Sequence, residues 1–408
     1  MSRKSSVMAA LFLGLLTTGV GCFTPPRPPI PEADLKAVTQ GNNTFAIELY
    51  QKWASQTDAD KNIGISPYSI SSALAMTYIG ARGDTATQMA KVLHFNPDQD
   101  AFHPMFAGFV DHLMKHDATS QRQLASANAI WVERTMPVQE PFQALMKNLY
   151  GTGTLRQVDF IHQGEAVRQE INGWVGERTQ KMIPEVLPTG SLDASTRMAL
   201  VNAFYFRDFW KHQFSPEATQ SADFHISPNK SVKVSMMFQE NVFRYASGNN
   251  YEMVELPYVG DRFTMTIVLP KAHDQLEAVE KALPELNEWM ARLRLRELRL
   301  FVPRFTLEGQ TTLSDTLSAM GLPMDGDYSG ITPGVSISEI HHAAKIKVDE
   351  EGTTAAAATA VQAKSEGPPP TAPTIRCDHP FLVILRDTSS GSILFMGRVT
   401  QPETSDVK

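Results

Sequence analysis

The sequence predicts an α+β fold built as one domain, and three observations carry that prediction. Helix-type patterns dominate the first part of the chain, and strand-type runs with a period of two dominate the second part. Residues 379–400 form two apolar strands joined by a Ser-Ser-Gly turn. Because an isolated two-stranded hairpin is at best marginally stable in water, this hairpin must pack into sheets made upstream. Residues 350–373 therefore form a long loop inside one domain, not a linker between two domains.

Charge and composition exclude several classes of protein. The chain has 408 residues, a net charge of −7 and 42% hydrophobic residues, which is a globular composition. The acidic balance argues against nucleic acid as a partner, because phosphate binding needs a concentrated basic face. The basic stretch 292–304 is interpreted as a solvated face, with a polyanion site as the alternative. There is no Gly-x-Ser-x-Gly elbow and no phosphate loop, so the sequence does not indicate an enzyme. We expect a monomer with no catalytic residues, no metal site and no cofactor.

The N-terminus has the pattern of a signal peptide. Two positive residues precede the apolar run 7–20, which is too short for a membrane-spanning helix. Residues 19–22, Gly-Val-Gly-Cys, resemble the bacterial lipobox, although Gly19 stands where that pattern prefers Leu. We therefore expect residues 1–21 to be removed and Cys22 to carry a lipid that anchors the exported protein to the cell envelope. Simple secretion and an uncleaved anchor are the alternatives.

A proline-rich segment follows the signal peptide. Proline fixes φ and favours an extended chain, so residues 22–38 are expected to form a stiff tether. The chain has two cysteines, Cys22 and Cys377. If Cys22 carries a lipid, no intramolecular disulfide is possible, and the core alone must hold the domain together.

The segment 42–89 contains the expected first helices. Residues 42–50 follow a mixed helical pattern, and Pro67 stands where a helix begins, because its missing N–H costs nothing there. Residues 71–79 form a buried helix rich in small residues, which a glycine ends. Thr85 is expected to cap the next helix.

Strand-type patterns follow these helices. Residues 124–132 and 198–206 are long apolar runs, and 251–270 contains two β-like runs around a Gly-Asp turn, as in a hairpin. Residues 298–308 are strand-like, and 312–322 form a short helix closed by a glycine. Together these segments predict a large antiparallel or mixed sheet.

The loop 350–373 contains a regular alternation. Every second residue from Thr353 to Ala363 is small or β-branched and uncharged, whereas the residues between them become polar from Gln362 onward. A strand over residues 353–366 would be about 45 Å long, which matches one long strand of a large sheet. The segment is therefore compatible with two states, a loop and a strand. Composition alone also allows an inert surface loop or a short Ala-rich helix.

Five ordered motifs resemble the serpin family, and they run from about residue 42 to residue 402. Residues 349–360, DEEGTTAAAATA, resemble the serpin hinge. The other four are 65–89, similar to the shutter helix; 201–214, with its Asn and Trp landmarks; 340–352, which leads into the hinge; and 379–399, similar to the C-terminal signature.

The resemblance implies a specific architecture. It places a single serpin domain over residues 39–402 and a short tail at 403–408. The domain would have a large central sheet, two smaller sheets, eight or nine helices, and an exposed reactive loop at 350–376.

The resemblance also implies a protease inhibitor that acts as a suicide substrate. A target endopeptidase would attack the reactive loop and form a covalent acyl-enzyme. The cut loop would then insert into the central sheet, and the attached protease would be dragged away and distorted. The intact fold would be metastable, with a kinetic barrier to insertion. The alternative is a non-inhibitory serpin that binds other molecules or is cleaved without trapping the protease.

The resemblance assigns roles to individual residues. The hinge comprises Glu350, Gly352, Thr353, Ala355, Ala356, Ala357 and Ala358; the shutter comprises Ser66, Ser69, Asn202 and His342; and the breach comprises Trp210, Arg304 and Glu350. Small hinge residues would let the strand slide into the sheet, whereas non-inhibitory relatives often carry bulky or charged residues there. Two positions depart from the family pattern: Thr354 replaces a Glu on the outward face, and Arg304 replaces a Lys in the ion pair with Glu350.

The family's spacing, counted from Glu350, places the reactive bond at Glu366–Gly367. A buried carboxylate needs a charged partner, so this bond predicts a target protease with a basic specificity pocket. The alternative is the trypsin-type bond Lys364–Ser365, which would shorten the inserted strand and favour cleavage without trapping. Cleavage after Ala363 or Ser365, by a broad elastase-like or a cysteine protease, is a third choice.

Overall fold

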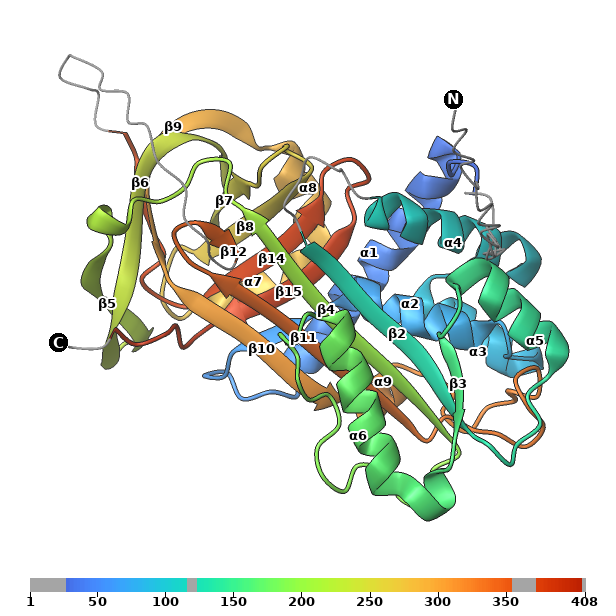
Figure 1. The fold of residues 1–408 in the computed structure, drawn as a ribbon. Coiled ribbons are helices and arrows are strands. Elements are labelled where there is room, and N and C mark those ends of the chain that lie inside the picture. The colour runs from blue at the N-terminus through green and yellow to red at the C-terminus, as the bar shows by residue number, and fades with distance from the viewer. Residues whose placement is uncertain (1–26, 116–122, 354–371, 406–408) are drawn as a thin grey trace, which may run out of the picture.

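The computed structural model describes residues 27–115, 123–353 and 372–405. Within these ranges the chain is mainly helical at first and rich in strands later, which confirms the α+β class (Figure 1). Two sheets, one of six strands and one of nine, pack with the helices around a shared core.

The six-stranded sheet is mixed and is built around long strands. Its order is β10 (Phe305–Thr312), β11 (Glu339–Val348), β4 (Met198–Phe209), β2 (Gln123–Glu133) and β3 (Leu155–Val158), and the short strand β12 (Gly352–Thr353) also pairs with β4. β11 runs parallel to β4, and β2 runs antiparallel to β4. β4 is buried almost throughout, because both faces of the sheet are covered at its centre.

The nine-stranded sheet contains the C-terminal hairpin. Its order is β1 (Ile63–Ile65), β15 (Ile393–Val399), β14 (Phe381–Asp387), β8 (Phe263–Pro270), β7 (Tyr251–Pro257), β6 (Lys230–Ser247), β9 (Arg294–Pro303) and β13 (Thr374–Arg376), with β5 (Gln220–Ser227) paired to β6. β6 pairs in turn with β5, β9 and β7 along its length. The strands that we expected in two smaller sheets are thus connected through β6.

Nine α-helices lie in the described residues. They are α1 (Glu32–Ala54), α2 (Pro67–Tyr78), α3 (Gly83–Leu93), α4 (Gln99–Met114), α5 (Glu140–Leu145), α6 (Phe160–Arg178), α7 (Leu276–Lys281), α8 (Leu286–Ala291) and α9 (Ser314–Ala319). A π-helical turn (Met146–Tyr150) and two 3-10 helices (Pro216–Ala218 and Leu283–Glu285) complete them. None of the helices in these ranges is long and apolar enough to cross a membrane.

Three local expectations differ from the structure. α1 begins at Glu32, so residues 32–38 of the expected tether are helical, and acidic side chains in this first turn favour a helix start. α3 begins at Gly83, so the predicted cap at Thr85 was wrong: the Thr85 hydroxyl accepts a hydrogen bond from the N–H of Asp327 at 2.7 Å instead. The predicted strand 298–308 is two strands in different sheets, which separate at Arg304.

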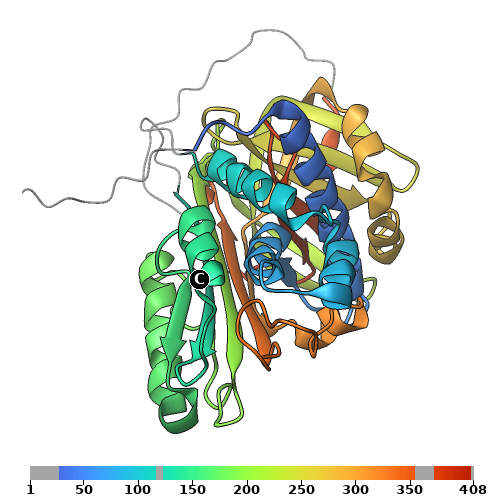
Figure 2. The ribbon, with the colours of Figure 1, turned by 90° about the vertical axis from the view of Figure 1, so that its right-hand side faces the viewer.

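Helices cover the two faces of the six-stranded sheet unequally. α6 packs on one face, where Trp174 meets Trp131 of β2 edge to face at 5.9 Å between ring centroids. The helices α1 to α4 lie on the opposite side (Figure 2). α2 is buried along its whole length between β2 and β4 on one side and β15 on the other.

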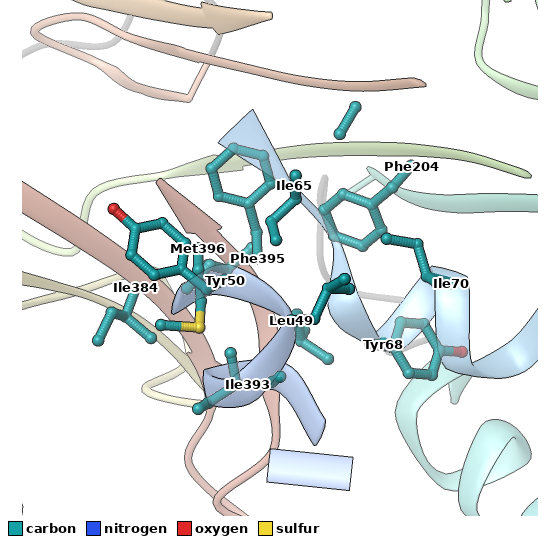
Figure 3. Close-up of a cluster of buried hydrophobic side chains, with 14 of the residues drawn as sticks. Leu49, Tyr50, Ile65, Tyr68, Ile70, Phe204, Ile384, Ile393, Phe395 and Met396 are labelled. Carbon is teal, nitrogen blue, oxygen red and sulfur yellow. The ribbon is translucent and has the colours of Figure 1, made fainter. Parts of the chain in front are cut away.

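The main core lies between these helices and both sheets. Figure 3 shows Leu49 and Tyr50 of α1, Ile65 of β1 and Phe395 of β15 converging on one cluster. Phe204 of β4 reaches it from the six-stranded sheet and stacks on Phe395, with 6.3 Å between ring centroids. The core therefore fixes α2 and the final hairpin directly beneath β4.

Candidate functional site

The candidate site is the junction between β4 and β11, which we call the seam. The two strands pair in parallel, with residues 339–345 opposite residues 199–205. Beyond this ladder β11 continues to pair with β10 but no longer with β4. In its place β12 pairs with β4 in the antiparallel direction, with Gly352 opposite Phe209 and Thr353 opposite Asp208. The chain thus turns back at the upper end of the seam and starts down into it (Figure 1).

Gly352 is required at this turn by a close backbone approach. A Cβ atom at this position would lie 2.2 Å from the carbonyl oxygen of Asp208 and 2.7 Å from the Cα of Phe209. Thr353 is fully buried, and its hydroxyl lies 2.9 Å from the hydroxyl of Tyr258. The hinge residues that follow, Ala355, Ala356, Ala357 and Ala358, lie outside the described residues, as do Glu366, Gly367, Lys364, Ser365 and Cys22.

Trp210 closes the upper end of the seam from one side. Its indole N–H donates to the carbonyl oxygen of Asp349 at 3.0 Å, and its backbone N–H donates to that of Glu351 at 2.9 Å. The indole is buried and stacks on Tyr258, with 4.4 Å between ring centroids. Because Tyr258 also contacts Thr353, the indole, the phenol and the start of β12 pack as one group.

Arg304 and Glu350 form an ion pair at the same end. The guanidinium Nε lies 2.8 Å from Oε2 of Glu350, and a terminal nitrogen lies 2.6 Å from Oε1, so the pairing is bidentate. The Thr219 hydroxyl donates to the same carboxylate. Burial alone would raise the pKa of Glu350, but the hydrogen bonds from Arg304 and Thr219 hold it below its ordinary value. Glu350 therefore stays ionised, and the ion pair fixes the turn that leads into β12.

The four shutter residues lie together beneath the middle of the seam, and all are fully buried. His342 of β11 stands directly opposite Asn202 of β4, and their side chains are hydrogen bonded across the seam. Ser66 and Ser69 at the start of α2 meet them from below: the Ser66 N–H donates to Nε2 of His342 at 3.1 Å, and the Asn202 amide donates to the Ser69 hydroxyl.

The partners of His342 fix its tautomer. A backbone N–H only donates, so Nε2 accepts from Ser66, and the ring proton sits on Nδ1 and is donated to Asn202. Burial lowers the pKa of His342 to about 3, which keeps the ring neutral. The seam is therefore closed twice, by the backbone ladder and by a neutral side-chain network between both strands and α2.

Other residues of the site were missed by sequence reasoning. Ser126 and Asn128 of β2 extend the network, since the Ser69 hydroxyl lies 2.8 Å from that of Ser126, and Asn202 donates to the amide oxygen of Asn128. Two polar residues spaced by two in the apolar run 124–132 were a usable signal. Tyr258 and Thr219 carried no such signal, because their roles depend on chain segments far away in the sequence.

The polar side chains of the seam hold its strands and α2 together and are paired with one another. Ser66 contacts His342 through its backbone N–H, but its hydroxyl donates to the carbonyl oxygen of Leu394 at 2.7 Å and not to the imidazole. The group of described residues that has metal-ligand geometry lies beside the other sheet, at His273, Asp378 and His379.

Comparisons with known proteins agree on one family. A family model described as "Serpin (serine protease inhibitor)" matches residues 40–402. Human antithrombin-III is 36% identical over 392 residues, which cover 91% of this chain and 84% of that protein. Human leukocyte elastase inhibitor is 36% identical over 385 residues, covering 90% of this chain and all of that protein. The crystal structure of Serpin48 from the insect Tenebrio molitor superposes with a TM-score of 0.80 at 30% identity, covering 90% of this chain and 98% of that one.

Replacing His342 by Gln tests whether the neutral imidazole sets the acid sensitivity of the fold. Its pKa of about 3 in the folded state lies below the value of about 6.5 expected in the unfolded chain. The folded state therefore binds fewer protons, so the stability that the neutral ring contributes is complete above about pH 6.5 and is lost as the pH falls towards 3. Between pH 7 and pH 5 the loss is about 2 kcal/mol.

The measurement is the urea unfolding midpoint by tryptophan fluorescence at both pH values. Glutamine at position 342 keeps a hydrogen-bond donor and an acceptor but does not titrate. The loss of stability from pH 7 to pH 5 should therefore be smaller in His342→Gln than in the unmodified protein, by about 2 kcal/mol. His103, whose pKa burial lowers to about 4, is present in both proteins, so its contribution cancels. An equal change of the urea midpoint between pH 7 and pH 5 in the two proteins would contradict the view that His342 is buried in its neutral form.

Proposed function

The chain belongs to the serpin family of protease inhibitors, and we propose that it traps its target by inserting the cleaved reactive loop into the seam. The observation that carries this proposal is the position of β12, whose two residues already pair with β4 at the upper end of the seam. The next residues of the loop follow β12 directly in the sequence. Insertion then extends a ladder that already exists.

The strand directions favour this insertion. β4 and β11 are parallel, and β12 is antiparallel to β4. A strand that continues from β12 between them would be antiparallel to both neighbours. One parallel ladder would be replaced by two antiparallel ladders, which are slightly more stable per residue. The cost is the opening of the seam, including the contact between His342 and Asn202.

The register supports the choice of small hinge residues. In the register of Gly352 opposite Phe209 and Thr353 opposite Asp208, Ala355 would lie opposite Phe206 and Ala357 opposite Phe204. These phenylalanines belong to the main core, as does Tyr258, which Thr353 contacts. The alternate residues from Thr353 onward would therefore face the core, where a small side chain fits and an unpaired charge is costly.

The same register supports Glu366–Gly367 as the reactive bond. It brings Ala363 opposite Met198, the first residue of β4. Glu366 would then emerge just past the far end of the sheet, and a protease attached to it would be carried along the whole length of β4. Cleavage after Lys364 would leave the protease two residues closer to the sheet.

We also propose that the protein is exported and anchored through a lipid on Cys22. The support is the sequence pattern of residues 1–22. The described chain starts beside the domain, where Arg27 forms an ion pair with Asp111 of α4 at 2.6 Å. The segment between this point and Cys22 is short, so a lipid there would hold the domain close to the membrane surface.

A pair of neighbouring substitutions tests insertion. Thr353→Glu places a carboxylate against Tyr258 in the core, whereas Thr354→Glu is the same change on the residue that would lie across from half-buried Arg207. Burying an unpaired carboxylate costs several kcal/mol. We expect Thr353→Glu to reduce SDS-stable complex with a cleaving protease at least about tenfold, since about 1.4 kcal/mol is a factor of ten, and Thr354→Glu to inhibit normally.

The unmodified protein provides the control for this pair. Its melting temperature should rise strongly after cleavage of the loop, because the inserted strand adds backbone pairing and burial. Fast cleavage with neither complex nor a rise in melting temperature would favour the non-inhibitory alternative. Equal loss of complex in both variants would contradict the proposal that residue 353 faces the core and residue 354 faces the opposite side of the sheet.

A second pair of substitutions identifies the reactive bond. Glu366→Ala should abolish complex formation with a glutamyl-specific protease, because the acyl-forming residue is lost, whereas Lys364→Ala should leave it unchanged. The mass of the released peptide gives the bond directly, with residues 367–408 expected. If a complex forms with a trypsin-like protease and is lost in Lys364→Ala but not in Glu366→Ala, the reactive bond is Lys364–Ser365 instead.

The lipid anchor is tested by Cys22→Ser in a bacterial expression host. The unmodified protein should incorporate labelled palmitate and sediment with membranes, since a diacylated cysteine binds membranes stably. The variant should lose the label and become soluble. Cys377→Ser is the matched control, because Cys377 is buried in the domain. Labelling that survives in Cys22→Ser would refute the assignment.

A further inference from the structure

A cluster of histidine and aspartate side chains lies away from the seam, beside the nine-stranded sheet. It consists of His273, Asp378 and His379, whose potential metal-binding atoms all lie within 4.8 Å of one another. His273 follows β8, and the other two residues lie between β13 and β14. The pairing of β14 with β8 brings these segments together, although more than a hundred residues separate them. Nothing in the inhibitory mechanism uses them.

The hydrogen bonds of His379 leave one ring nitrogen for a cation. Nε2 lies 2.8 Å from the carbonyl oxygen of Pro270, which only accepts, so Nε2 carries a proton. Nδ1 lies 3.0 Å from Oδ1 of Asp378. Nδ1 therefore faces a carboxylate oxygen, and this contact needs either a proton or a metal ion between the two atoms. Imidazoles that bind metals usually donate their other N–H to a carbonyl or carboxylate, as Nε2 does here.

Two more imidazoles surround this pair. The ring of His273 stacks on that of His379, with 4.3 Å between centroids. The ring of His225 of β5 lies edge to face with that of His273, at 5.1 Å between centroids. The backbone N–H of His225 donates to the carbonyl oxygen of Asp378 at 2.7 Å, which fixes β5 against the cluster. His273 is exposed, and its ring would have to turn out of this stack to direct a nitrogen to a common ion, because the in-plane lone pairs of parallel rings do not converge.

We propose that His273, Asp378 and His379 form a binding site for Zn²⁺ or a similar transition-metal ion. His225 lies near His273 but is not one of the residues whose ligand atoms converge. Imidazole nitrogen and carboxylate oxygen are the ligands that Zn²⁺ accepts at about 2.0–2.2 Å in tetrahedral sites. Mg²⁺ and Ca²⁺ prefer oxygen ligands throughout, which this cluster does not offer. The carbonyl of Pro270 would be the outer partner that orients His379.

The site has a structural consequence for the reactive loop. Asp378 lies just after β13, the three-residue strand with which the chain rejoins the sheet after the loop. β13 is held to β9 by a short parallel ladder. An ion bound at the cluster would join the segment after β13 to the turn after β8, and would therefore strengthen the attachment of the C-terminal end of the loop.

The test uses the full chain without an affinity tag, stripped with EDTA. Calorimetric titration with ZnSO₄ should give one ion per chain, and Co²⁺ should give the visible absorption of a tetrahedral nitrogen and oxygen site. His273→Ala and Asp378→Asn should each weaken Zn²⁺ binding at least about tenfold, because loss of even an outer partner costs about 10–100-fold. Zn²⁺ should raise the melting temperature of the unmodified protein and not that of these variants.

His162→Ala is the matched control. His162 also pairs with an aspartate, Asp159, at 3.0 Å, but on an exposed helix start. This variant should bind Zn²⁺ as the unmodified protein does. Melting curves in EDTA establish that each variant is folded before titration. Absence of stoichiometric binding, or equal affinity in Asp378→Asn and the unmodified protein, would overturn the site. Because the titration involves no protease, its outcome is separate from that of the inhibition experiments.

Discussion

The pairing of β4 with β11 is the constraint on which the rest of the structure depends. It joins the two halves of the six-stranded sheet, and it lies where a further strand would enter in the proposed mechanism. Three kinds of contact hold it: the parallel backbone ladder, the His342–Asn202 hydrogen bond, and the contacts from Ser66 and Ser69 of α2. The large core beneath keeps α2 in place, so packing remote from the seam decides how firmly it is closed.

The side chains at the seam suit a junction that is closed in this structure and that would open for strand insertion in the proposed mechanism. Apolar residues across the junction would hold it by packing alone and would provide no directional hydrogen bonds. Hydrogen-bonded neutral groups hold it with a few directional contacts, while leaving any of them unpaired in the interior is costly. If the seam opens as proposed, this arrangement would favour a closed state and an open state in which the bonds are remade, and would disfavour states between them.

Much of this organisation was predictable from the sequence, for identifiable reasons. The long apolar strands and the final hairpin follow local patterns, and the motif residues Ser66, Asn202 and His342 were found by family resemblance and lie together in the structure. Ser126 and Asn128 were missed, although their spacing on one face of β2 was visible. The Thr85 cap failed because a tertiary contact with Asp327 uses that hydroxyl. Arg304 looked like part of one strand because local propensity does not report that a chain crosses between sheets.

The two residues of β12 have a kinetic consequence. Starting a new strand in a sheet is the slow part of strand formation, because the chain must be ordered before any ladder repays that entropy. The first two pairs are already formed here, so insertion as proposed would extend a ladder and would not have to start one. Insertion is an intramolecular step with or without β12, so its rate would be independent of protein concentration. What β12 would change is the size of that rate, and a ready start would favour insertion over release of the protease, the step with which it would compete.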